Sequence, residues 1–232
     1  MCLYTSVPLY LLPSMNAKEF LKKGLAELDT QCSEEQIAAF MTYLTELKKW
    51  NRAYNLTALK TDEDIIIKHF LDSLLYLKAI PSGPLKLADA GAGAGFPGIP
   101  LKIVRPDTEL SLIESSGKKA AFMRHIARLL YLGNTDVIEQ RLEHLENKYE
   151  KSFDVIVSRA TFSINDFLKM ACPYVKDGGR LILNKGPRFS EELKEMEQAR
   201  HDNLPSVEIM KVDLPFTDVK RNLILLSCKM KP

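Results

Sequence analysis

Apolar residues recur at intervals of three and four positions between residues 16 and 80, which is the spacing of one face of an amphipathic helix. The pattern predicts three helices in this segment. Ser33 and Gln36 form a capping-box pair before the second helix, and Thr61 and Asp64 open the third. Helical structure is predicted to end at three turn-forming residues, Pro81, Gly83 and Pro84.

After residue 84 the pattern changes to short apolar runs that alternate with helical periodicity. Helices are predicted at 117–131 and 164–175, and strands at 85–90, 110–114, 135–140, 153–158 and 180–184. This alternation is typical of an α/β fold with a doubly wound parallel sheet. The last two apolar runs, 207–212 and 222–228, have no long helix between them, so they predict an antiparallel pair at the sheet edge. The predicted organisation is a loose extension (1–15), an N-terminal helical cap (16–82) and a sheet-containing core (83–232).

The turn after the first strand is rich in glycine and contains Asp-Ala-Gly-Ala-Gly-Ala-Gly-Phe-Pro-Gly over residues 89–98. Glycine tolerates positive φ and lets the backbone approach a ligand closely. Gly93, Gly95 and Gly98 fit the dinucleotide fingerprint G-x-G-x-x-G. The same turn fits acidic-x-G-x-G-x-G, the first motif of S-adenosylmethionine (AdoMet) methyltransferases, with Asp89 as the acidic residue and Gly91 as the first glycine. A glycine-rich turn without a ligand is the third interpretation.

Two prolines and one carboxylate bear on the choice of ligand. Pro97 and Pro100 remove backbone N–H donors where a pyrophosphate would bind, and AdoMet has no phosphate, so they favour AdoMet over NAD. Glu114 ends the second strand about twenty residues after the glycines, where an acidic side chain accepts hydrogen bonds from a cofactor ribose. Both cofactors carry ribose. Without a ligand, Glu114 is a solvated carboxylate at a strand end.

Composition narrows the function classes. The chain has 232 residues with 32 basic and 30 acidic side chains, so it lacks the basic excess typical of nucleic-acid binders, and an RNA surface must be a local patch. Its four cysteines and four histidines lack ligand spacing, which predicts no metal site, no disulfide framework and a reducing, cytoplasmic setting. No apolar run approaches the ~18 residues of a membrane helix. The apolar start lacks a basic segment, so it is predicted as an extension and not a signal peptide.

Several sequence blocks, in order along the chain, resemble one bacterial family. They are Trp50-Asn51, Tyr54-Asn55-Leu56-Thr57, His69-Phe70-Leu71-Asp72-Ser73, the segment 91–101 with its Pro-Gly-x-Pro, and Ser158-Arg159-Ala160. Over residues 50–185 the chain resembles the glucose-inhibited division protein B family, also called RsmG, which methylates a guanine at N7 in small-subunit (16S) ribosomal RNA. The resemblance implies a class I AdoMet-methyltransferase (Rossmann-like) core, AdoMet as cofactor, and small-subunit ribosomal RNA or its particle as partner.

The resemblance also implies AdoMet contacts at Gly91, Phe96, Leu142, Glu143 and Arg159. Leu142 and Glu143 would read the adenine edge, although Leu142 is larger than the residue typical of the family. Phe96 would line the pocket or face the sulfonium cation. Arg159 would bind the AdoMet carboxylate or an RNA phosphate. The structural alternatives are a surface charge for Glu143, a core aromatic for Phe96, and an ion pair holding a loop for Arg159.

The chemistry of guanine N7 explains why no catalytic residue stands out. N7 is a lone-pair acceptor without a proton, exposed on the major-groove edge, so its methylation requires no general base. In-line positioning of the methyl group and N7 supplies the catalysis instead. Two other functions stay open. They are a NAD(P)-dependent oxidoreductase on the same type of sheet, and a non-catalytic RNA-binding protein, which has no need of the Glu114 carboxylate.

Candidate RNA contacts come from basic and aromatic side chains. Lys185 follows the fifth strand on the cofactor side of the sheet, and Arg188 lies close behind it. Arg124 belongs to a basic helix. Tyr54 and Asn55 would stack on, or hydrogen-bond to, an unpaired base. Each of these residue types is also common on ordinary surfaces, so these contacts are a hypothesis.

Overall fold

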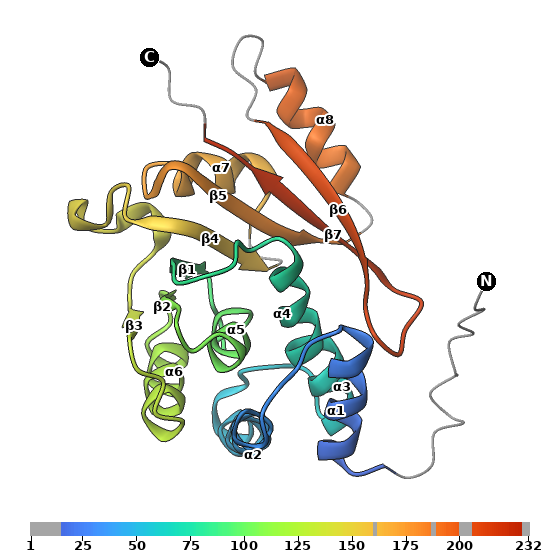
Figure 1. Ribbon diagram of the computed structural model, residues 1–232. Helices are drawn as coiled ribbons and strands as arrows, with labels where there is room; N and C mark the ends of the chain where they lie inside the picture. Colours follow the sequence, from blue (N-terminus) through green and yellow to red (C-terminus); the bar gives the residue numbers. More distant parts are fainter. Residues whose placement is uncertain (1–14, 160–161, 187–188, 200–205, 229–232) are drawn as a thin grey trace.

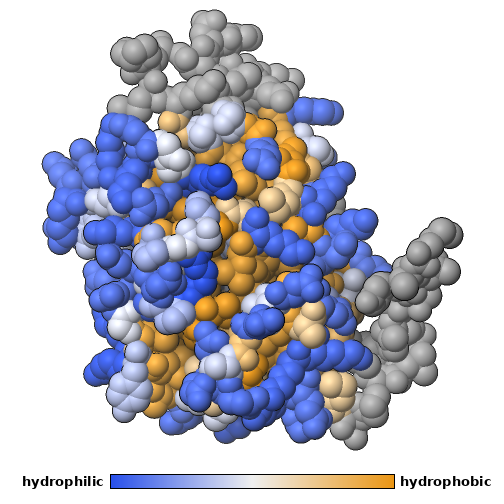
Figure 2. Space-filling view, viewed as in Figure 1, coloured by the Kyte–Doolittle hydropathy of each residue, from blue (hydrophilic) through white to orange (hydrophobic). Residues whose placement is uncertain are grey.

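Figure 1 shows the computed structural model, which describes residues 15–159, 162–186, 189–199 and 206–228. A seven-stranded sheet crosses the molecule and carries helices on both faces. On the face seen in Figure 2, hydrophilic side chains surround hydrophobic ones that gather toward the middle. The helices bury apolar side chains of one face, such as Phe20, Leu21 and Leu25 in the first helix, as the periodicity predicts.

The first two helices begin at side-chain caps. Asn16 caps α1 (Ala17–Glu27), and Ser33 caps α2 (Glu34–Tyr54), each in a complete capping box. The Ser33 hydroxyl accepts from the Gln36 amide at 3.3 Å, and the Gln36 side chain accepts from the Ser33 amide at 2.9 Å. The capping-box prediction for the second helix is confirmed.

The third predicted helix begins at Thr61, as expected, but it is not regular. It consists of α3 (Asp62–Ile65), the π-helical turn η2 (Ile66–Leu71), α4 (Asp72–Leu74) and the 3-10 turn η3 (Leu75–Lys78). Three consecutive isoleucines at 65–67 lower helix propensity because β-branched side chains crowd a regular helix. π-helical turns occur often at functional sites. Here the turn carries side chains that meet the carboxyl edge of the sheet.

The sheet has the strand order β3-β2-β1-β4-β5-β7-β6. Strands β1 to β5 are parallel, and β7 pairs antiparallel with both β5 and β6. The bounds are Lys86–Ala90 (β1), Glu109–Ile113 (β2), Thr135–Ile138 (β3), Phe153–Arg159 (β4), Val175–Lys185 (β5), Val207–Asp213 (β6) and Lys220–Leu226 (β7). The predicted doubly wound sheet with an antiparallel C-terminal edge is confirmed.

Neighbouring strand residues face different cores. Leu87 and Val155 pack into the core shared with the N-terminal helices, whereas Ala88 and Ile156 pack into the core on the other face. The first core also contains side chains of α5 (Gly98–Val104) and α6 (Gly117–Leu129), and the second those of α7 (Ile164–Ala171) and α8 (Phe189–Ala199). Burial on both faces explains why these strands are almost continuously apolar. The sequence pattern did not predict α8.

The order of the strands locates the expected ligand site. The chain moves from β1 to β2 and β3 in one direction, and β4 begins on the other side of β1. Ligands bind in open α/β sheets outside the carboxyl ends of the strands at such a switch point. β1 ends at Ala90, directly before the glycine turn, and β4 ends at Arg159.

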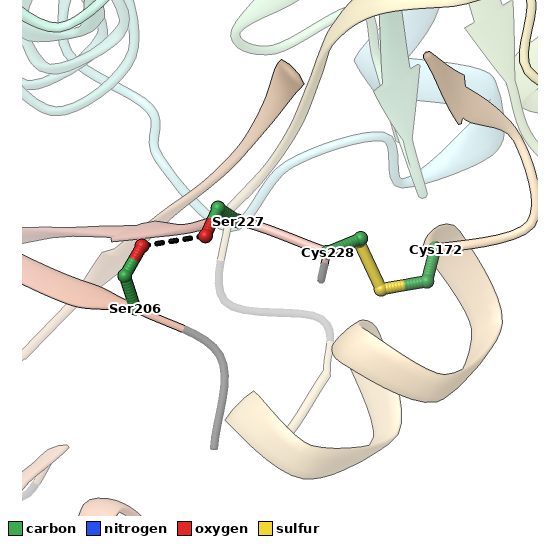
Figure 3. The surroundings of a disulfide bond; sticks show 4 residues. All are labelled: Cys172, Ser206, Ser227 and Cys228. Carbon is green, nitrogen blue, oxygen red and sulfur yellow. Dashed lines mark hydrogen bonds between the residues drawn. A yellow bond between two sulfur atoms is a disulfide. The ribbon is translucent and has the colours of Figure 1, made fainter. Parts of the chain in front are cut away.

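A disulfide joins Cys172, at the end of α7, to Cys228, just after β7 (Figure 3). The two Cα atoms are 5.7 Å apart although the residues are 56 positions apart in sequence. The hydroxyl groups of Ser206 and Ser227 are hydrogen-bonded nearby. The sequence spacing predicted no disulfide framework and did not indicate this single bond, which forms because β7 lies between β5 and β6 and ends beside α7.

Reduction of this disulfide is expected to destabilise the protein by about 4 kcal/mol, from the loop-closure entropy of a closed loop of this length. Urea unfolding with and without a thiol reductant measures the change. The variant Cys172→Ser is the control, because its stability is expected not to respond to reductant. Equal stability of the wild-type protein in both conditions, with all four thiols alkylated in the native state, contradicts a bond between these cysteines.

Candidate functional site

The glycine turn lies at the carboxyl end of β1, beside the end of β2. The amides of Gly91 and Ala92 both donate to the Ile113 carbonyl, at 2.9 and 3.1 Å. Gly91, Gly93 and Gly95 have positive φ values of 70, 61 and 98°. A Cβ atom on Gly93 would meet nothing nearer than the Gly91 carbonyl oxygen, at 4.0 Å. Gly93 therefore borders open space in a backbone conformation that favours glycine.

At Gly95 the close packing of α5 and of the cap also excludes a side chain. A Cβ atom there would collide with Ile99 and lie 2.9 Å from the Tyr43 hydroxyl. That hydroxyl, which is buried on α2, donates to the Ala94 carbonyl at 2.5 Å. The cap thus holds the glycine turn from behind and leaves the Gly93 side open.

Glu114 holds the turn from the β2 side. Its Oε2 accepts from the Gly93 amide and its Oε1 from the Ser116 amide, both at 2.9 Å. The residue is only 8% exposed. Each carboxylate oxygen has a second lone pair, so these two bonds leave acceptor capacity for ribose hydroxyls at the open side of the turn.

Asp89 lies buried beneath the turn. Its Oδ2 accepts from the Gly98 amide at 2.7 Å, and its Oδ1 has no hydrogen-bond partner among the described residues. A Cβ atom on Gly98 would lie 2.9 Å from Oδ2, which explains the glycine at that position. Burial raises the pKa of Asp89 to about 7, more than its hydrogen bond to Gly98 and the charge of Arg159 lower it.

This raised pKa predicts that Asp89 makes stability fall as the pH rises. Between about pH 4 and pH 7 the folded protein retains a proton that the unfolded chain releases, so the free energy of unfolding decreases across that window. Asp89→Asn keeps an acceptor for Gly98 but cannot ionise. Urea unfolding at several pH values is expected to show the variant gaining stability relative to wild type as the pH rises. A constant difference from pH 4 to pH 8 contradicts this.

Arg159, at the end of β4, contacts the cap and the glycine segment together. Its Nη1 donates to the Lys68 carbonyl at 2.8 Å, and its Nη2 donates to Nδ1 of His69 at 2.9 Å. The guanidinium carbon lies 5.3 Å from the Phe96 ring centroid, within range of a cation–π contact. Phe96 is buried, and its ring stacks against those of His69 at 4.3 Å and Tyr43 at 5.2 Å.

Asp72 joins this cluster to the C-terminal strands. The carboxylate is 2% exposed and accepts from Arg159 at 3.3 Å, from Nε of Arg221 at 2.7 Å and from the Asn184 amide at 3.4 Å. Tyr76, one turn later, donates to the Ser158 carbonyl at 2.6 Å. One side of the cap therefore bonds to β4, β5 and β7 where the carboxyl ends of β4 and β5 meet.

Comparison with known proteins shows to which family the chain belongs. The family model described as rRNA small subunit methyltransferase G matches residues 36–221. The chain belongs to the rRNA small subunit methyltransferase G family. A Geobacter member (strain M21) is 43% identical over 91% of this chain and 98% of its own length. A member from Alkaliphilus oremlandii is 37% identical, with 92% and 91% covered.

Solved structures support the fold of the family core. A SAM-dependent methyltransferase from Aquifex aeolicus superposes with a TM-score of 0.53 at 17% identity, over 71% of this chain and 93% of that one. A ribosomal protein L11 methylase from Lactobacillus delbrueckii gives 0.51 at 16% identity, over 72% and 79%. At this level of identity the likeness concerns the fold, and it agrees with the predicted class I AdoMet-methyltransferase sheet.

The two adenine-edge candidates lie in the turn after β3. Leu142 begins a short 3-10 helix, and its side chain is buried in the core on the α7 face. Glu143 is more exposed, with a carboxylate oxygen 3.7 Å from the Arg141 guanidinium. Of these two candidates, Leu142 can therefore offer a ligand only its backbone, whereas Glu143 can offer its carboxylate.

Lys185, predicted to contact RNA, is engaged within the protein. Its ammonium group donates to the Phe162 carbonyl and pairs with Glu192 of α8 at 2.8 Å, and the side chain is only 11% exposed. In this arrangement it holds the segment after β4 against α8. Arg188 lies outside the described residues.

The other RNA candidates lie on the surface. Arg124 pairs with Glu139 at 2.9 Å on the outer side of α6. Tyr54 is 43% exposed at the end of α2, and its ring lies tilted against Trp50 with centroids 5.4 Å apart. Asn55 follows it in the left-handed conformation that ends the helix, with φ of 50°. The exposed Tyr54 ring and the adjacent Asn55 amide can reach a ligand without breaking an internal contact.

His69 and Asp72 were not among the site residues predicted from the sequence. Both stood in the His69-Phe70-Leu71-Asp72-Ser73 block of the family resemblance, which was the available signal. Among the described residues, no group of three or more histidine, cysteine or acidic side chains is placed to hold a metal ion. No helix of the described ranges is long and apolar enough to cross a membrane.

Proposed function

We propose that this protein is an AdoMet-dependent methyltransferase that modifies N7 of a guanine in small-subunit ribosomal RNA. The observation that carries the proposal is the family match over residues 36–221. The relatives it resembles at 35–43% identity are named ribosomal RNA small subunit methyltransferases. The NAD(P)-dependent oxidoreductase alternative has no support from these relatives.

The residues at the carboxyl edge of the sheet fit AdoMet. The open side of Gly93 admits a ligand against the backbone, and the free lone pairs of Glu114 suit ribose hydroxyls. Glu143 and the Leu142 backbone are proposed to bind the adenine edge. Arg159 is proposed to bind the methionine carboxylate from the adjacent β4 end, in addition to its contacts with the cap. Gly91, Gly95 and Phe96 shape this site.

The protein's part in the reaction is orientation. AdoMet, when bound, supplies an electrophilic methyl group on a sulfonium. Because guanine N7 carries no proton, no residue needs to act as general base. The rigid glycine turn and the cap-bonded Arg159 would hold the reactants in line, and such positioning is worth about 7–11 kcal/mol of barrier. The cap side chains against Phe96 would exclude water from one side of the site.

RNA contacts are proposed for Tyr54 and Asn55 first. The exposure of both side chains supports stacking on, or hydrogen bonding to, an unpaired base. Arg124 would have to give up or share its pair with Glu139 to bind a phosphate. Lys185 is a poor phosphate ligand for the same reason, since Glu192 already neutralises it.

We further propose that the protein acts in the cytoplasm, on small-subunit ribosomal RNA or its particle, with residues 16–82 as cap, 83–232 as core and 1–15 as an extension. Thiols stay reduced in the cytoplasm. In cells, the Cys172–Cys228 pair is therefore expected to be open, and in oxidised purified protein closed. Alkylation of lysates at low pH, followed by mass spectrometry, distinguishes the two states.

The decisive experiment combines binding and product analysis. Calorimetry with AdoMet and with NAD in parallel is expected to show binding of AdoMet only. Incubation with AdoMet and small-subunit ribosomal RNA or subunits that lack the modification is expected to yield 7-methylguanosine in nuclease digests. NAD binding without AdoMet binding overturns the proposal in favour of an oxidoreductase. RNA binding without AdoMet binding favours a non-catalytic protein, and a methyl group on another atom overturns the N7 assignment.

A further inference from the structure

The His69 imidazole occupies the junction between the cap and the proposed cofactor site. It lies in the π-helical turn η2 and stacks on Phe96, with centroids 4.3 Å apart and planes 15° from parallel. One ring nitrogen, Nδ1, is 2.9 Å from Nη2 of Arg159. The other, Nε2, is 2.7 Å from the Thr57 hydroxyl. Both nitrogens are thus engaged.

The direction of these hydrogen bonds follows from the partners. A guanidinium has only donors, so Nδ1 of His69 must accept from Arg159 and carry no proton. The proton of the neutral ring is then on Nε2, where it donates to the Thr57 oxygen. Burial, with the Arg159 charge as the second cause, lowers the pKa of His69 to about 3. The ring is therefore neutral at physiological pH.

From this geometry we infer that His69 is a positioning residue, whose Nδ1 lone pair fixes the Arg159 guanidinium for the AdoMet carboxylate. The inference rests on the proposed function and extends it to a residue that does not itself touch the cofactor. The Lys68 carbonyl and the Asp72 carboxylate hold Nη1, and His69 holds Nη2. Two anchored nitrogens fix the plane of a guanidinium, whereas one leaves it free to rotate.

Thr57 extends this arrangement toward the surface. Its hydroxyl also accepts from the Leu59 amide at 3.2 Å, and its amide donates to the Asn51 side chain at 2.8 Å. The segment that follows Tyr54 and Asn55 is thereby bonded through His69 to Arg159. A shift of this segment would change the support of the guanidinium.

Three substitutions at position 69 separate positioning from packing. In His69→Asn the amide oxygen can replace Nδ1, so the acceptor is kept and the ring is lost. In His69→Gln the longer side chain places its amide near the Nε2 position, on the Thr57 side. In His69→Phe the ring stack on Phe96 is kept and the acceptor is lost. Calorimetry measures AdoMet affinity for each, and thermal unfolding confirms that each is folded.

The positioning role predicts that His69→Asn binds AdoMet better than His69→Gln and His69→Phe, which are expected to lose about 10-fold or more, the effect of losing a hydrogen bond to a charged group. In methylation assays the KM for AdoMet is expected to rise in these two, with kcat at saturating AdoMet changed less than about 3-fold. The opposite ranking, with His69→Phe nearest to wild type, shows that the ring acts only by packing and overturns the inference.

The same measurements distinguish failure of the inference from failure of the proposed function. If the wild-type protein does not bind AdoMet, the proposed function fails. If wild type binds AdoMet and all three variants bind it equally well, the function stands and the positioning role is wrong. Thr57→Val is expected to lose less affinity than His69→Phe, because it removes the partner of Nε2 but leaves Nδ1 in place.

Discussion

Gly93→Val is expected to lower the affinity for AdoMet by at least about 100-fold, while the protein stays folded. The Cβ direction of Gly93 points into open space at the mouth of the glycine turn, so a branched side chain there fills the volume in which the cofactor would approach the backbone. Nothing in the protein collides with the first added carbon, so the fold itself tolerates it. Calorimetry with AdoMet, together with circular dichroism, measures the two effects separately.

Backbone strain needs its own control, because Gly93 has φ of 61° and an L-residue at such a φ costs about 1–2 kcal/mol. Gly83 provides it. Its φ is 85°, a Cβ atom there also meets nothing within 4 Å, and it lies in the turn between the cap and β1. Gly83→Val is expected to lose similar stability but no AdoMet affinity. Normal affinity in Gly93→Val contradicts the placement of the cofactor at this turn.

Asp72→Ala is expected to lower the free energy of unfolding by about 3–5 kcal/mol, the cost of breaking a buried ion pair by removing one partner. The 2%-exposed carboxylate is the shared partner of Arg159 and Arg221, whose side chains are 17% and 26% exposed. Its removal takes away the carboxylate with which both partly buried guanidinium groups form ion pairs. Urea unfolding measures the loss. In thermal unfolding, the substitution is expected to lower the midpoint temperature by roughly 10 °C.

A double-mutant cycle isolates the pair from other effects of the substitution. Arg221→Met removes the positive partner on β7 while keeping much of its apolar stem. In the Asp72→Ala background this second change is expected to cost less than in wild type, because the ion pair that it removes is already broken. Additive losses, or a loss below about 1 kcal/mol for Asp72→Ala, contradict a structural role for the pair.

Patterns within short segments predicted the fold well. The capping residues Ser33 and Thr61 start helices because their side-chain oxygens satisfy nearby amides, which is a local effect. Strands buried on both faces stand out as apolar runs wherever they lie in the sheet. The glycine turn was also predicted. A tight turn with positive φ that lets the backbone approach a ligand requires glycine, and this requirement is visible in the local sequence.

Those local patterns could not predict contacts between segments that are far apart in the sequence. Arg159 meets His69 and Lys68 about 90 residues away, and no local spacing encodes that pairing. Lys185 was predicted as an RNA contact from its place after the fifth strand, and its ion pair with Glu192 was not foreseen because the sequence pattern did not predict the helix that carries Glu192. Cys172 and Cys228 meet only because the last strand is inserted into the sheet.

Because β7 lies between β5 and β6, the sheet cannot be completed until the last strand has been synthesised. Residues 86–185, which contain the glycine turn and all five parallel strands, are synthesised before β7. Until residues 220–226 emerge, β5 has an unpaired edge and Asp72 has no Arg221. An open strand edge invites pairing with other chains. The nascent protein therefore completes its sheet late, and conditions that delay the C-terminal hairpin favour aggregation over assembly of the site.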